Sequence, residues 1–216
     1  MIAAVLVVGL ALPGVRVPVD AVAAVVERRV ITASEVDAEA RLALLARAPP
    51  ISGTPDLPSG PLDAALKKAV LDTMVAHELL ALEARRKGLV VREADVDVAV
   101  AAERARFASA EVARAFFARF GIDEELLRGR ARRDLLASAQ LSSGLADVKV
   151  SDDEARAYLE IDLGLAEGRP LPERIAAARA ALLAARREER TEKIVADIAR
   201  GVEVRIVADA PGAAPP

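Results

Sequence analysis

The amino-acid sequence predicts a mainly α fold: a multi-helix body with a small antiparallel sheet formed by N-terminal strands and the C-terminal strand. Alanine, leucine, arginine and glutamate dominate the chain, and these residues lose little side-chain freedom in a helix. Apolar residues recur at helical spacing in several long segments. Residues 202–207 (VEVRIV) instead alternate apolar and polar, which is the pattern of a strand with one buried face.

The composition narrows the function classes. Of 216 residues, 53% are hydrophobic and 29% are charged, so the chain can bury a core and still dissolve. The net charge of −3 gives no basic surplus for binding nucleic acid, and the interleaved acids and arginines indicate solvated helix faces with i,i+4 ion pairs. The absence of cysteine excludes disulfides, thiol catalysis and thiolate metal sites.

The N-terminus carries an apolar run over residues 2–12 (IAAVLVVGLAL). The run is too short to cross a bilayer, which takes about 20 residues, but it has the length of the apolar region of a secretory signal. We therefore expect residues 1–18 to be a signal peptide or flexible N-terminus, export to the periplasm, and membrane contact only through this segment. No Lys or Arg precedes the run, so an ordinary buried strand or helix is the alternative.

The first elements follow from short-range signals. Residues 22–26 (VAAVV) and Val30-Ile31 predict two short strands around a charged turn. Thr32 or Ser34 can then cap a helix that runs to about Arg47. Residues 48–61 are rich in Pro, Gly and Ser and predict a loop.

A series of helices is expected after this loop. The first is long and amphipathic and is stopped by Gly88, and Ser151 with Glu154 forms a capping box at the start of a later one. The helices are expected at residues 62–87, 92 to about 107, 109–121, 123 to about 141, 151 to about 161, and 172–200, with a linker at 142–150. The strand at 202–207 is expected to pair with residues 22–26 or the neighbouring strand, and 209–216 to be a disordered tail.

No residue pattern in the chain predicts catalysis. His77 is the only histidine, and with no second histidine and no cysteine it is better explained as a helix-face or core-edge residue than as a metal ligand. The carboxylates at Asp95 and Asp97, and those at 152–154, lie at expected helix starts, where the helix dipole already favours acids. No Gly-rich phosphate loop and no Gly-x-Ser-x-Gly motif is present. We therefore expect no catalytic, cofactor-binding or metal-binding residues, and no enzyme.

All phenylalanines fall in one helical neighbourhood, at Phe107, Phe116, Phe117 and Phe120. Adjacent residues on a helix point about 100° apart, so Phe116 and Phe117 cannot both face one core in the same direction. A core cluster is the simplest explanation of these residues. The alternative is that one of the two is exposed in a groove, where apolar surface often marks a binding site.

The order of these elements resembles the N-terminal domain of the SurA-like periplasmic chaperones, over most of residues 19–160. The segments that carry the resemblance are 19–26 (VDAVAAVV), 30–37 (VITASEVD), 71–90 (LDTMVAHELLALEARRKGLV), 91–140 with FGIDEELL at 120–127, and 148–154 (VKVSDDE). The chain departs from the family pattern at Glu27-Arg28-Arg29, where relatives have Asn after the first strand.

The resemblance implies an ATP-independent periplasmic chaperone that binds unfolded outer-membrane or envelope polypeptides through an apolar groove, without cofactor. It also implies one chaperone domain over 19–208, to which the helix 172–200 and the strand 202–207 return. Candidate residues for contacting such clients are Phe107, Phe116, Phe117, Phe120 and Met74. Many relatives insert a parvulin prolyl isomerase domain after the helix at Ser151, and residues 162–171 are too few to hold one. A degenerate prolyl isomerase and a helical structural subunit of an envelope assembly are the alternatives.

Overall fold

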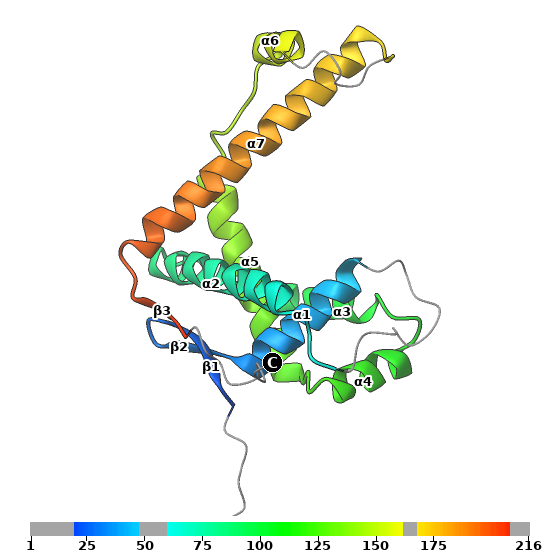
Figure 1. Ribbon diagram of the computed structural model, residues 1–216, viewed down its shortest axis with the longest axis vertical. Coiled ribbons are helices and arrows are strands. Elements are labelled where there is room, and N and C mark those ends of the chain that lie inside the picture. Colours follow the sequence, from blue (N-terminus) through cyan, green and yellow to red (C-terminus); the bar gives the residue numbers. More distant parts are fainter. Residues whose placement is uncertain (1–19, 48–59, 162–167, 208–216) are drawn as a thin grey trace, which may run out of the picture.

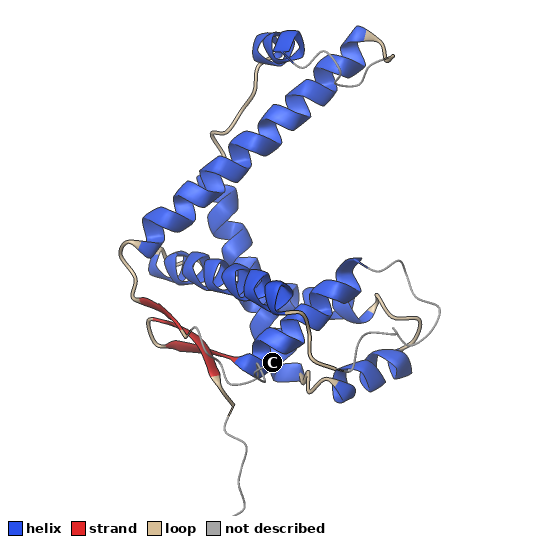
Figure 2. Cartoon of the chain, viewed as in Figure 1, coloured by secondary structure: helices blue, strands red, loops and turns tan. Residues whose placement is uncertain are grey.

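The computed structural model describes residues 20–47, 60–161 and 168–207, and within these ranges it contains seven helices and three strands. The mainly α fold with a small antiparallel sheet is confirmed (Figures 1 and 2). The elements are β1 (Val22–Val26), β2 (Arg29–Thr32), α1 (Ala33–Arg47), α2 (Ala64–Arg86), α3 (Glu93–Arg104), α4 (Ala110–Arg119), α5 (Glu124–Gly144), α6 (Asp152–Ile161), α7 (Leu171–Ala199) and β3 (Val204–Ile206). The predicted signal segment at 1–18 and tail at 209–216 lie outside the described residues, as does most of the predicted loop at 48–61.

The sheet joins segments from far apart in the sequence. Its strand order is β2-β1-β3, and both pairings are antiparallel, with Val25 opposite Val30 on one side and Arg205 on the other. At one end of the β1–β3 ladder the N–H of Glu27 donates to the carbonyl of Glu203 at 2.9 Å, and at the other the N–H of Val207 donates to the carbonyl of Ala23 at 2.9 Å. The predicted pairing of the last strand with residues 22–26 is therefore confirmed, with β3 shorter than the alternating sequence suggested.

Two large apolar cores and a small cluster between α2 and α5 lie in the helical body. The first packs the sheet on α1, α2 and the end of α7, and its buried side chains include Ile31, Met74 and Leu79. The second is formed by α1, α3, α4 and α5 and includes Leu42, Val96 and Phe116. Helix α5 packs most extensively against α2, so α2 and α5 form the central pair of the body.

Local capping begins several helices at the predicted places. Thr32, one of the two caps considered for α1, forms a capping box with Glu35: the Thr32 N–H donates to the Glu35 carboxylate at 3.0 Å, and the Glu35 N–H lies 3.3 Å from the Thr32 hydroxyl. The predicted box at α6 is also present, since the Ser151 N–H donates to Glu154 at 2.8 Å and the Glu154 N–H to the Ser151 hydroxyl at 3.2 Å. Asp123 accepts from the Leu126 N–H at 2.8 Å and caps α5.

Two helix ends differ from the prediction. Helix α5 continues to Gly144, so the segment Ser142–Gly144 is helical and not part of a linker, and α3 ends at Arg104 before Phe107. At Gly144 the helix touches α7: a Cβ there would lie 2.7 Å from the Ile194 Cδ1. The backbone of α5 and the side chains of α7 are thus in close contact at this point, and this contact with a distant segment is invisible to local sequence rules.

Helices α6 and α7 form an arm that projects from the body (Figure 1). The C-terminal end of α7 lies beside the sheet. From there the helix projects away from the body, and its N-terminal part packs against α6. Only Ala178 of α7 is fully buried, whereas α2 buries eight residues. The molecule is therefore angular rather than spherical, with one well-packed part and one thinly packed part.

Candidate functional site

The arm is held together by a small contact surface and by polar links. Its core consists of Ala155, Leu159 and Ala178, with Tyr158 and Ile175 packed at the edge. Ion pairs then join the two sides: Arg186 pairs with Glu154 and also donates to the carbonyl of Lys149 at 2.8 Å, and Arg179 pairs with Asp152. Small residues let α6 and α7 approach closely, and the ion pairs stabilise the orientation of α6 relative to α7.

The base of the arm is anchored in the body. Val195 and Ile198 of α7 pack against the sheet core. Arg190 donates from Nε to the carbonyl of Gly144 at 3.3 Å, next to the close contact between Gly144 and Ile194. These contacts set the direction in which the arm leaves the body.

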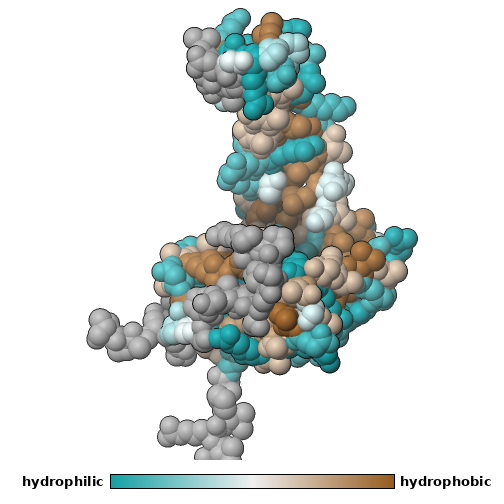
Figure 3. Space-filling model, turned by 90° about the vertical axis from the view of Figure 1, so that its right-hand side faces the viewer, coloured by the Kyte–Doolittle hydropathy of each residue, from teal (hydrophilic) through white to brown (hydrophobic). Residues whose placement is uncertain are grey.

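Between its anchored base and its packed tip, α7 carries apolar side chains that no core covers. Leu182 and Leu183 are only half-buried, and neither belongs to a core cluster of the described residues. Figure 3 shows hydrophobic residues gathered along the arm and where it meets the body. This part of the helix thus presents apolar surface to solvent.

A hollow lies at the angle between α5 and α7, and we call it the elbow recess. It has a volume of about 640 Å³. Its lining is formed by Ser138, Leu141, Ser142, Leu145, Ala146, Val148, Lys149 and Arg187. Four of these residues are apolar and the serines are small, so the recess offers an apolar surface with polar groups at hand for a peptide backbone.

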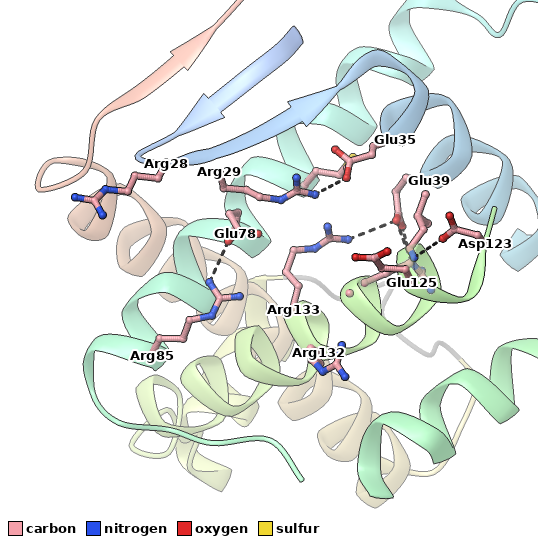
Figure 4. Close-up of a pocket in the computed structure, with 14 residues that line it drawn as sticks. Arg28, Arg29, Glu35, Glu39, Glu78, Arg85, Asp123, Glu125, Arg132 and Arg133 are labelled. Atoms are coloured by element: carbon pink, nitrogen blue, oxygen red, sulfur yellow. Dashed lines mark hydrogen bonds and ion pairs between the residues drawn. The ribbon is translucent and has the colours of Figure 1, made fainter. Parts of the chain in front are cut away.

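A larger hollow, of about 740 Å³, lies between the sheet, α1, α2 and α5, and we call it the charged cleft (Figure 4). Its lining is formed by Arg28, Arg29, Glu35, Glu39, Met74, Glu78, Arg85, Asp123, Glu125, Leu126, Gly129, Arg130, Arg132 and Arg133. Arginines and carboxylates dominate it, and Met74 and Leu126 are its large apolar residues. The expected apolar hollow is therefore not here, and the elbow recess is the more apolar of the two.

The four phenylalanines form one aromatic cluster. Phe107 lies against Phe116 and Phe117, with ring centroids 5.1 and 5.3 Å apart, and Phe116 lies 4.9 Å from Phe120. Phe116 is 1% exposed and Phe117 is 7% exposed. The alternative that one of the two is exposed is wrong, because Phe107 folds back from the segment between α3 and α4 and covers both rings.

The predicted client-contacting residues consequently lie inside the protein. Phe107, Phe116, Phe117 and Met74 are buried, and the half-buried Phe120 is flanked by the guanidinium groups of Arg41 and Arg119 at 4.6 and 5.1 Å. Met74 lies at the wall of the charged cleft. A role for these five residues in client binding stays a prediction, and their burial favours a part in the core.

The arginines of α5 pair mostly with other helices. Arg128 bonds to Glu93 and Asp97 of α3 at 2.7 and 2.6 Å, and Arg130 donates to both carboxylate oxygens of Glu39 of α1 at 2.9 Å. Two i,i+4 pairs also occur in α5, between Arg128 and Glu124 at 3.9 Å and between Arg130 and Asp134 at 3.8 Å. The expected i,i+4 pairs are therefore present in α5, but its shorter ion pairs join α5 to α1 and α3.

Two carboxyl groups have strongly lowered pKa values. Hydrogen bonds from Arg132 and then Arg128 lower the pKa of Glu93 to about 2. In the arm, hydrogen bonds from Arg186 and from Ser151 lower the pKa of Glu154 to about 2. Both groups stabilise helix contacts as charged species, and neither is poised to exchange protons near neutral pH.

The remaining chemical candidates have structural roles. His77 lies on α2 with its Nδ1 2.9 Å from the Asp134 carboxylate of α5, at the surface between the two central helices. Asp95 bonds to Arg92 at the start of α3. Within the described ranges, no group of three His, Cys, Asp or Glu side chains is arranged to hold a metal ion.

The fold and the site together define a class: a mainly helical domain, closed by a sheet from both ends of the described chain, with a projecting two-helix arm and an apolar recess at its elbow. Comparison with known families identifies the family, because the model of the SurA-like N-terminal domain matches residues 1–141. The match covers well over half of the chain, and the chain belongs to this family. No curated protein sequence matches it.

Family membership indicates a chaperone-type role, a family of periplasmic proteins, and polypeptides as the general class of ligand. The matched region ends within α5, before the arm and β3. Helix α6 ends at Ile161 and α7 begins at Leu171, and a domain of about 50 residues or more cannot fit between them. Among the described residues, no helix is long and apolar enough to span a membrane.

Proposed function

We propose that the protein is an ATP-independent periplasmic chaperone that holds unfolded outer-membrane or envelope polypeptides, without isomerase activity. The observation that carries the proposal is the arm, a 29-residue helix with a single buried residue that stands over an apolar recess. A monomer gains no stability from keeping such apolar surface in water, so a ligand is the simplest reason for it.

The geometry suits a ligand without fixed shape. An unfolded segment lying in the elbow recess could bury its apolar side chains against Leu141 and Leu145, and contact the uncovered stretch of α7 at Leu182. Binding that favours the unfolded client delays its aggregation by mass action and needs no nucleotide. We further propose that residues 19–208 act as one chaperone domain and that export depends on residues 1–18.

Aggregation of an unfolded outer-membrane β-barrel, followed by light scattering, tests the proposal. The intact protein should suppress scattering. Ala146→Glu should weaken the suppression several-fold, because Ala146 is exposed and lines the recess, so the change places a charge there without disturbing a core. Ser143→Glu is the matched control, since Ser143 is exposed nearby but does not line the recess.

The outcomes separate the alternatives. Suppression by the intact protein and the Ser143 variant, but not by the Ala146 variant, supports a chaperone that uses the elbow recess. Equal suppression by the intact protein and both variants would mean that clients bind outside the elbow recess. If none of the three proteins suppresses aggregation, the chaperone proposal is wrong. Turnover in a peptide isomerisation assay would favour the prolyl isomerase, and a single stoichiometric partner in cross-linked cells would favour a structural subunit.

A further inference from the structure

The charged cleft brings together arginines from three separate elements. Arg28 lies in the turn before β2 and Arg29 is the first residue of β2. Arg85 lies at the end of α2, and Arg133 lies in the middle of α5. Figure 4 shows these side chains around one side of the hollow, with Asp123 and Glu125 toward the other. Like charges repel at close range, so their convergence requires anions among them.

Most of the acids in the cleft are already engaged. Glu35 pairs with Arg29 and also accepts the Thr32 N–H in the capping box of α1. Glu78 is buried and pairs with Arg85 at 3.1 Å. Glu39 accepts two hydrogen bonds from Arg130 at 2.9 Å. These carboxylates therefore have closer partners than Arg28 and Arg133.

Arg133 is a buried cation that the described residues leave undersatisfied. It is only 8% exposed, yet no described residue accepts a hydrogen bond from its guanidinium, and its buried Nε has no hydrogen-bond partner. Its ion pairs are long, 3.5 Å to Glu39 and 3.6 Å to Asp134, and both acids have closer partners. A buried guanidinium that lacks acceptors is costly unless something supplies them.

At the mouth of the same hollow, Arg28 is exposed and forms no ion pair with any residue in the described ranges. Arg85 is held by a single bond and is 48% exposed in its side chain. The cleft thus has free guanidinium donors at its rim and an undersatisfied one within it. Guanidinium groups are well matched in shape and charge to carboxylates.

We propose that the charged cleft binds carboxylate groups of an acidic polypeptide segment. The rim guanidinium of Arg28 donates to one acidic side chain, and Arg133 donates to another that enters the hollow past Gly129, where no Cβ narrows the wall. This inference rests on the proposed function only in taking the ligand to be a polypeptide. It adds an electrostatic site, separate from the elbow recess, that selects clients by charge.

Fluorescence anisotropy with two labelled peptides tests the proposal: one alternates Glu with Ser, and the other replaces every Glu by Gln. The full-length protein should bind the Glu peptide roughly tenfold more tightly at low salt, and the difference should shrink as salt rises. Arg28→Glu should remove most of this preference. Arg114→Glu, the same charge change on the exposed face of α4, should leave it in place because Arg114 does not line the cleft.

Arg133→Met sharpens the test, since it keeps the bulk of the side chain and removes its donors. It should lower affinity for the Glu peptide and leave weak binding of the Gln peptide unchanged. Equal binding of the two peptides, or equal effects of Arg28→Glu and Arg114→Glu, would overturn the proposal. If the Glu preference is found while the protein suppresses no aggregation, the cleft proposal stands and the chaperone proposal fails.

Discussion

The body and the arm use different means to hold helices together. In the body, α2 alone buries eight residues, and the two large apolar cores extend through α1 to α5, the end of α7 and the sheet. In the arm, three small or apolar residues form the core, and ion pairs and a capping box provide the other contacts. Burial of apolar area is the dominant source of stability, so the body carries the stability of the protein and the arm is free to keep its apolar surface exposed.

The largest expected effect is in the body. Phe116→Ala should lower the free energy of unfolding by about 3–5 kcal/mol, because Phe116 is 1% exposed and contacts Phe107, Phe117 and Phe120. Leu159→Ala removes a comparably buried side chain from the arm, and should abolish amide exchange protection in α6 with little shift of the body's unfolding midpoint. Urea unfolding and hydrogen exchange measure the two. Equal shifts of the midpoint would show that arm and body are one cooperative unit.

A smaller effect is expected where arm and body meet. Gly144→Ala should cost about 1 kcal/mol, because the new Cβ would lie 2.7 Å from the Ile194 Cδ1 and the tightly packed Ile194 side chain has to move. Ile194→Val removes that atom, so Gly144→Ala should be neutral or stabilising in its presence. A double-mutant cycle of unfolding free energies gives the coupling. Additive effects would mean that Ile194 simply turns aside and that this contact does not direct the arm.

The smallest expected effect is a loss of arm stability at low pH. Because the folded pKa of Glu154 is lowered to about 2 from an ordinary 4.5, its contribution to the arm is fully present above about pH 4.5 and is lost as pH falls toward 2. Carboxyl chemical shifts should give a midpoint near 2 for Glu154. Arg186→Ala should raise that midpoint, whereas Arg179→Ala, which removes a cation paired with Asp152, should not. A midpoint near 4.5 in the intact protein would mean that Arg186 does not hold the arm.

Short-range features were predictable from the sequence. Ser151 and Glu154 are three residues apart and their capping box forms within one helical turn, so nothing distant decides it. The strand near residue 204 was also recognisable, since alternation shows a half-buried strand wherever its partner lies. Its pairing with residues 22–26 or the neighbouring strand was expected because strands were predicted near both ends of the chain.

Features made by distant residues were not predictable in the same way. Burial of both Phe116 and Phe117 depends on Phe107, which covers the two rings from another segment. The charged cleft gathers Arg28, Arg85 and Arg133 across most of the body, and periodicity along one helix cannot show that. The run of arginines at 128–133 was a usable signal, because so many cations on one helix need acids from other helices.

The position of β1 at the centre of the sheet has a consequence for newly made molecules. A ribosome delivers β1 first among the described elements and β3 last. Until Val204–Ile206 arrives, one side of β1 carries backbone groups without their native partners, and such an edge readily recruits stray chains. A variant truncated before β3 should keep this edge of β1 unpaired permanently. A protein that we propose to prevent the aggregation of others should then become prone to aggregation itself.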